Sequence, residues 1–158
     1  MKISYDPTDL NLPKVIEWLT KDSYWAFGRD PEVVKQSFAN SIPISIIDND
    51  NSFIGVGRLV TDTCTFGWLC DVYVEPNSRG KGVGHAITKA AIDYFNHLPA
   101  FRLLLKTRDA HGVYKDLGFS ELAHPDSWLA IEQGFGASPY WLNFDHDLSP
   151  RDSNSTDI

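Results

Sequence analysis

The sequence predicts an α/β fold in which a sheet of mixed direction, with roughly six or seven strands, carries about four helices on its faces. Two observations lead to this class. Short β-rich runs bounded by turn residues alternate with segments whose apolar residues recur at helical spacing. Hairpin-like pairs of strands precede a glycine-rich turn at residues 79–84, and a β-α-β-α-β succession follows it.

Length and composition support one globular domain. The chain has 158 residues, and we assign residues 1–148 to the domain and residues 149–158 to a polar tail expected to be disordered. The formal net charge of −7, without a basic run, argues against nucleic-acid binding. Cys64 and Cys70 form no metal-binding pattern, so no metal is expected. No leader and no membrane-spanning stretch is visible, which predicts a cytoplasmic protein without a membrane partner.

The first segments predict a strand and two helices. A short strand is expected at residues 2–5. The second helix is expected to begin at Asp30-Pro31-Glu32, which has the order N-cap, N1 proline and acidic residue that is typical of a helix start. An aromatic loop, residues 23–31, joins the two helices. The first helix covers residues 12–19, where the apolar residues follow helical spacing: Leu12, Val15, Ile16 and Leu19.

The middle of the chain predicts a hairpin and a third strand. Residues 42–47 and 53–60 are β-rich and are separated by the turn cluster at residues 48–51. Residues 65–74 form the next β-rich run, which leads directly into the glycine-rich turn.

The remaining elements continue the alternation. A helix is expected from about residue 82 to residue 97, followed by a buried-type strand at residues 101–106. A short helix is then expected to end near Leu117, and Gly118 suits the left-handed position that follows a helix. Residues 119–122 and 128–132 are assigned to the last two strands.

The glycine-rich turn has the composition of a phosphate-binding loop. The glycines let backbone N–H groups approach an anion, and the following helix adds positive potential at its N-terminus. The spacing of Gly80, Gly82 and Gly84 differs from the dinucleotide fingerprint, and no Gly-Lys-Ser/Thr ends it as in a P-loop. Arg79 and Lys81 add positive charge, so a pyrophosphate is the expected ligand.

Two motifs together resemble the GCN5-related N-acetyltransferase (GNAT) family. Arg79-x-x-Gly82-x-Gly84 is similar to its phosphate motif, and Tyr114-x-x-x-Gly118-Phe119 is similar to its later tyrosine segment. The resemblance covers roughly residues 53–122. It implies a GNAT-type, mostly antiparallel central sheet, acetyl-CoA as co-substrate, and transfer of an acetyl group to an amine.

The resemblance also implies roles for individual residues. The strand backbone at Val72 and Val74 would pair with the pantetheine arm, and an N–H near Val72 would polarise the thioester carbonyl. Tyr114 stands at the position of the family's general acid, and a phenol suits the protonation of a thiolate. The full set implied for coenzyme A is Val72, Tyr73, Val74, Arg79, Gly80, Lys81, Gly82, Val83 and Gly84.

The general base is not evident from the sequence. Trp68 occupies the position of the strand glutamate found in the histone-acetylating branch, and an indole cannot accept the proton. Asp71 is the candidate for base or ammonium anchor, and strand alternation places it on the face opposite Val72. His111 is a second candidate for base or substrate contact, and a water chain is a further alternative.

The acceptor pocket is expected at the aromatic loop. Trp25 would contact the acceptor amine, and Arg29 could hold a carboxylate or pair with Asp62. Together with these residues, the resemblance implies an N-acetyltransferase for a primary amine of a small molecule, acting by direct attack in a ternary complex. A non-catalytic acyl-CoA sensor and a protein or peptide N-acetyltransferase remain alternatives, and a homodimer is left open.

Overall fold

The computed structural model describes residues 1–131, which form a five-stranded sheet in the order β1-β2-β3-β4-β5. The first three junctions are antiparallel, and β5 lies parallel to β4. The strands are β1 (Lys2–Ser4), β2 (Ile42–Ile47), β3 (Phe53–Thr61), β4 (Phe66–Val74) and β5 (Arg102–Leu104).

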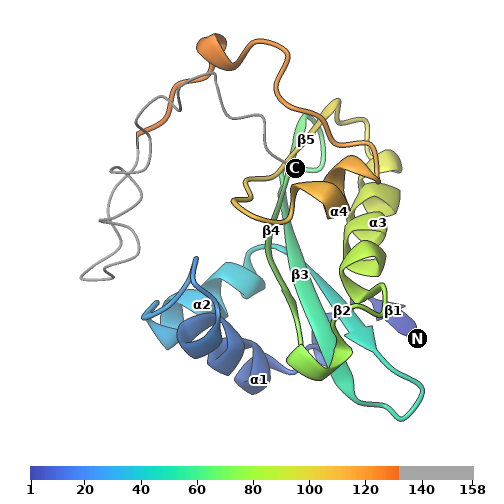
Figure 1. Ribbon diagram of the computed structural model, residues 1–158. Coiled ribbons are helices and arrows are strands. Elements are labelled where there is room, and N and C mark those ends of the chain that lie inside the picture. Colours follow the sequence, from blue (N-terminus) through green and yellow to red (C-terminus); the bar gives the residue numbers. More distant parts are fainter. Residues whose placement is uncertain (132–158) are drawn as a thin grey trace, which may run out of the picture.

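Helices cover both faces of the sheet (Figure 1). α1 (Leu12–Glu17) and α2 (Pro31–Ala39) lie on one face and bury a cluster that includes Trp18 and Tyr73. α3 (Val83–Asn96) lies on the other face over a second buried cluster, which the short α4 (His111–Lys115) adjoins. The α/β class with helices on both faces is therefore confirmed.

Local signals place the helix ends close to their predicted positions. Asp30 caps α2 by accepting a 2.7 Å hydrogen bond from the N–H of Glu32, and Pro31 is its first residue. Asn11 caps α1 in the same manner. The predicted helix over residues 12–19 is α-helical only to Glu17, because a π-helical turn (Trp18–Asp22) follows and buries Trp18 and Leu19.

The last two predicted strands are wrong in the described part of the chain. Residues 119–122 and 128–131 pair with no strand there, and Glu132 lies outside the described residues. Leu129 and Ile131 are 97% and 93% exposed, so their β propensity finds no sheet face to pack on. The described sheet has five strands rather than six or seven. The domain at residues 1–148 and the tail at 149–158 extend past the described residues and stay predictions.

Glycines in β3 allow α3 to approach the sheet closely. A Cβ built on Gly57 would lie 2.6 Å from Cγ2 of Ile87, and one on Gly55 would lie 2.7 Å from Cγ1 of Val83. Both contacted side chains are fully or almost fully buried, so they have little room to move.

We therefore expect Gly57→Ala to lower the free energy of unfolding by about 1–3 kcal/mol through overpacking against Ile87. Gly112→Ala is the matched control, because a Cβ on Gly112 in α4 meets nothing within 4 Å. Denaturant unfolding checks both variants, and an unfolding free energy equal to that of the wild type in Gly57→Ala would contradict the close packing.

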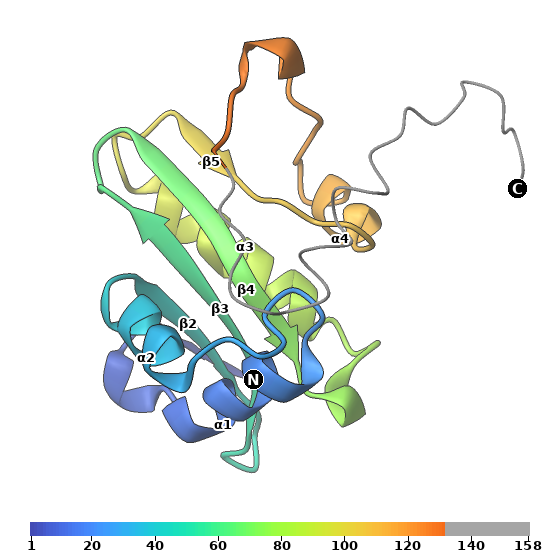
Figure 2. The same cartoon turned by 90° about the vertical axis from the view of Figure 1, so that its left-hand side faces the viewer.

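The pairing of β4 with its neighbours is interrupted where the site forms. It pairs with β5 through Phe66–Trp68 alone, so its β5-side edge is unpaired from Leu69 to Val74 in the described structure (Figure 2). On the β3 side a bulge lies opposite Gly57, because Val56 pairs with Tyr73 and Arg58 with Cys70. The bulge and the free edge give β4 an irregular, accessible backbone in the middle of the sheet.

Candidate active site

A cleft of about 1660 Å³ runs along β4 and joins the aromatic loop to the glycine turn. Five predicted residues do not line it: Gly80, Lys81, Gly82, Val83 and His111. The predicted residues that do line it are Trp25, Arg29, Asp71, Val72, Tyr73, Val74, Arg79, Gly84 and Tyr114.

The glycine turn forms an open cradle at one end of this cleft. Gly80 and Gly82 have φ values of +71° and +79°, and a Cβ on either would meet nothing within 4 Å. Gly82 is the N-cap of α3 and provides no side-chain cap, so the first N–H groups of this helix are available to a ligand. The side chain of Val83 is buried in the core, and only its backbone can serve the cradle. Arg79 is anchored by a 3.1 Å bond from Nε to the carbonyl of Val74.

Asp71 is held between two arginines on the side of the sheet that faces α1 and α2. Its Oδ2 accepts hydrogen bonds from Arg29 Nη1 at 2.9 Å and from Arg58 Nε at 2.7 Å. Burial alone would raise the pKa of Asp71, but attraction to Arg29 and Arg58 and the hydrogen bonds from them outweigh it, so the pKa is lowered. A carboxylate with a lowered pKa is a weak proton acceptor, and this geometry gives no support to Asp71 as the general base.

The backbone at Asp71 explains how the pair of arginines reaches it. Asp71 adopts a left-handed conformation with φ of +50° inside the bulge, which an aspartate tolerates better than most residues. Because the bulge adds one residue, Leu69 and Val72 both belong to or adjoin the core under α3. The carboxylate of Asp71 is directed instead to the arginines, which lie on the loop before α2 and on β3.

Tyr114 lies in α4 and lines the cleft. Its ring packs edge-on against Phe119 with centroids 6.0 Å apart, which accounts for the spacing of the predicted motif. Burial, with smaller contributions from Tyr24 and Asp109, raises the pKa of Tyr114 to about 12. The phenol is therefore protonated at neutral pH and can act as a proton donor.

The aromatic loop forms the wall near Tyr114. Tyr24 donates a 3.1 Å hydrogen bond to Asp109, and its ring meets Trp25 edge-on with centroids 5.0 Å apart. The Nε1 atom of Trp25 is buried with no hydrogen-bond partner within residues 1–131. His111 is exposed at the start of α4 and away from the cleft lining. Trp25 thus fits the predicted acceptor contact better than His111 does.

Arg58 lines the cleft and pairs with Asp71, and it is not among the residues expected from the sequence. Its signal was an arginine inside the otherwise apolar run Phe53–Thr61, where a charge is expected only with a partner. Asp62, the alternative partner considered for Arg29, instead accepts hydrogen bonds within its own turn from Cys64, Thr65 and Phe66. Arg29 pairs with Asp71.

Comparison with known proteins agrees with this geometry. The model of the acetyltransferase (GNAT) family matches residues 12–119. A Gibberella zeae protein assigned to the acetyltransferases is 32% identical over 159 residues, which cover 85% of this chain and 90% of that relative. The chain therefore belongs to the GNAT acetyltransferase family. It is an acyl-CoA N-acyltransferase whose co-substrate is acetyl-CoA.

Two solved structures have folds similar to that of this chain. A protein from Xanthomonas campestris assigned to the GNAT family has a TM-score of 0.78 and 26% identity, covering 84% of this chain and 92% of that chain. Rv2747 from Mycobacterium tuberculosis, whose structure contains CoA, has a TM-score of 0.64 at 19% identity and covers 77% and 73% of the two chains. At this identity Rv2747 supports the fold alone.

The described residues fit coenzyme A. The unpaired edge of β4 offers backbone donors and acceptors to an amide-containing arm such as pantetheine, and the cradle offers N–H groups to the pyrophosphate. Within residues 1–131 no group of three or more His, Cys, Asp or Glu could hold a metal ion. In the same residues, no helix has the length and apolar character needed to cross a membrane.

Proposed function

We propose that this protein transfers the acetyl group of acetyl-CoA to the primary amine of a small molecule by direct attack in a ternary complex. The observation that carries the proposal is the cleft along β4, which brings the free edge of β4, Tyr114 and the aromatic loop to one space. Acetyl-CoA supplies an activated thioester there. The aromatic wall favours a compact organic acceptor, and so does the buried N–H of Trp25, which has no hydrogen-bond partner among residues 1–131.

The backbone of β4 polarises the acyl group in this proposal. The bulge takes Val72 out of the regular ladder with β3, which supports an N–H directed at the thioester carbonyl oxygen. Such a pre-positioned donor contributes on the order of 3 kcal/mol to transition-state stabilisation. The side chains of Val72 and Val74 adjoin the core under α3, so their contribution is through the main chain.

Tyr114 protonates the departing thiolate in this proposal. Burial raises the pKa of the Cys70 thiol, which lines the same cleft, to about 12, similar to that of Tyr114. A phenol has a reference pKa of about 10, close to that of an alkyl thiol, so the Tyr114 hydroxyl suits the protonation of the departing thiolate. The raised pKa also makes Cys70 a poor nucleophile, which favours direct attack over a cysteine-bound intermediate.

The acceptor ammonium loses its proton to water in the cleft. Asp71 is engaged by two arginines, and His111 lies outside the cleft lining, so neither is favoured as the base. We assign Asp71 the role of holding Arg29 and Arg58 in place. A cytoplasmic location and a homodimer stay predictions from the sequence.

An amine-panel assay that follows free thiol release from acetyl-CoA tests the function. We expect a subset of small primary amines to give saturable, enzyme-dependent release well above hydrolysis. Peptides with free N-termini or lysines serve as the comparison class. Tight CoA binding with no turnover of any acceptor would favour the sensor, and turnover of peptides alone would overturn the small-molecule assignment.

A further inference from the structure

Two half-buried arginines at the acceptor end of the cleft carry one more positive charge than their partner neutralises. The guanidiniums of Arg29 and Arg58 both bond the same oxygen of Asp71. Their side chains are only 16% and 15% exposed, and that of Asp71 is 3% exposed. Asp71 is the one acidic partner recorded for either arginine within residues 1–131. A partly desolvated excess cation is costly, which makes it a strong anion-binding group.

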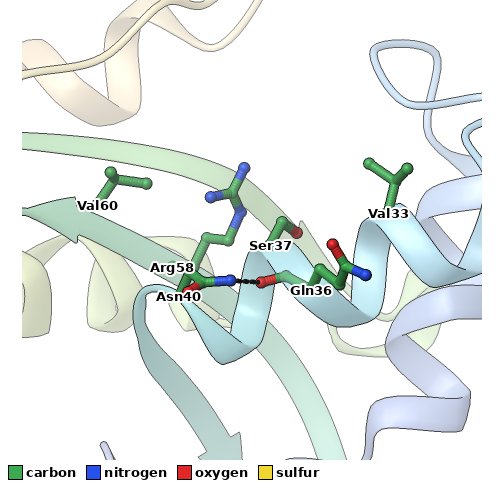
Figure 3. A pocket seen from close by; sticks show the side chains of 6 residues that line it. All are labelled: Val33, Gln36, Ser37, Asn40, Arg58 and Val60. Atoms are coloured by element: carbon green, nitrogen blue, oxygen red, sulfur yellow. Dashed lines mark hydrogen bonds between the residues drawn. The ribbon is translucent and has the colours of Figure 1, made fainter.

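Both guanidiniums face space that a ligand can occupy. Arg29 and Arg58 line the main cleft, and Arg58 also lines a smaller groove of about 350 Å³ between α2 and β3. Figure 3 shows the side chain of Arg58 rising from β3 beside α2, with Ser37 and Val60 nearby. Asp71 engages one nitrogen of each arginine, and a guanidinium has five N–H donors, so further donors remain on both.

We propose that Arg29 and Arg58 bind a carboxylate of the acceptor, so that the substrate is an amino acid or a similar amino carboxylate. This inference rests on the proposed function and names its substrate class. A carboxylate neutralises the single excess charge and matches the planar fork of a guanidinium. A phosphate dianion would leave one negative charge without a partner in a poorly hydrated site.

The location of the arginines also limits where the amine lies. Their shared partner Asp71 directly precedes Val72, whose N–H is assigned to the thioester carbonyl. A carboxylate bound at the arginines therefore places an amine a few bonds away next to the acyl group. Trp25 lines the same cleft and is available to contact the rest of the acceptor. Short amino carboxylates, including α-amino acids, satisfy this arrangement.

Matched acceptors test the proposal. Turnover of the standard amino acids is compared with that of their amides and of the corresponding decarboxylated amines, for example phenylalanine, phenylalaninamide and phenethylamine. We expect kcat/KM to be on the order of 10- to 100-fold higher for the acid than for its neutral partners, mainly through KM. β-Alanine against O-phosphoethanolamine distinguishes the anions. Equal turnover of acids and amines, or preference for the phosphate, would overturn the carboxylate assignment.

Charge compensation separates anion binding from a structural role. Arg29→Gln leaves a neutral pair of Arg58 and Asp71, and we expect the ratio of kcat/KM for the acid to kcat/KM for its decarboxylated amine to fall to about one. Adding Asp71→Asn restores one net positive charge and should restore part of the preference. A structural role predicts instead that the double variant is no better than the single one and that acids and amines lose turnover equally.

A binding measurement keeps the inference testable if the proposed function fails. Calorimetry on the protein–CoA complex compares the same acids and amines without any requirement for turnover. We expect carboxylate-dependent binding by the wild type and none by Arg29→Gln. If no acceptor is acetylated but carboxylates still bind in this way, the proposed function fails and the anion site stands. Absence of carboxylate dependence in both assays refutes the site itself.

Discussion

Replacing Gly82 with valine is expected to abolish binding of acetyl-CoA, with a loss of affinity on the order of 100-fold or more, while the protein remains folded. Gly82 begins α3, and a Cβ at this position would point into open space where the cradle N–H groups face their ligand. The added side chain would displace the pyrophosphate and cost two or more charge-assisted hydrogen bonds. Calorimetry with CoA measures the affinity, and circular dichroism checks the fold.

The left-handed backbone of Gly82 requires a control for strain. Valine at φ of +79° costs about 1–2 kcal/mol on its own. Gly118 has φ of +95°, has nothing within 4 Å of its Cβ position, and does not line the cleft. Gly118→Val should therefore lose similar stability and keep its affinity for CoA. Affinity like that of the wild type in Gly82→Val would show that the pyrophosphate lies elsewhere.

Replacing Tyr114 with phenylalanine is expected to lower kcat by roughly 100- to 10,000-fold with little change in acetyl-CoA affinity. Phenylalanine keeps the ring that packs against Phe119 and removes only the hydroxyl that donates the proton. Because the pKa of Tyr114 is about 12, the wild-type rate should not fall through loss of this proton below that pH. Steady-state kinetics with the best amine, together with CoA calorimetry, check both expectations.

A tyrosine away from the cleft provides the matched control. Tyr94 lies in α3 and contacts Tyr5 with ring centroids 5.1 Å apart, and it does not line the cleft. Tyr94→Phe should leave kcat unchanged. If Tyr114→Phe and Tyr94→Phe behave alike, the proton reaches the thiolate from another donor, and the assignment of Tyr114 fails.

Local signals explain why much of the framework was predictable. The caps at Asn11 and Asp30, the helical repeat of apolar residues and the glycines of the cradle act over a few residues. The hairpin of β2 and β3 follows from a turn cluster between two β-rich runs. These features do not depend on distant parts of the chain, and they sufficed to predict the α/β class and the position of the glycine turn before α3.

The last predicted strands failed because a strand requires a partner. Residues 119–122 and 128–131 have β-forming and aromatic side chains, but they pair with no strand in the described part of the chain. Local propensity cannot reveal whether an edge exists, since strand pairing joins residues that are distant in the sequence. The role of Asp71 could not be predicted for the same reason. Its environment is formed by Arg29, before α2, and by Arg58, on β3, and both are distant from it in the sequence.

The family resemblance, the glycine turn before α3 and the helix that carries Tyr114 could all be inferred from short stretches of sequence. The partners of Asp71 could not, because they come from segments that only the folded chain brings together. The bulge in β4 directs its carboxylate to Arg29 and Arg58, which lie 42 and 13 residues away in sequence. That ion-pair cluster depends on sheet register and on the loop packed over the sheet. It changes Asp71 from a candidate base into the partner of two arginines that we assign to the acceptor's carboxylate.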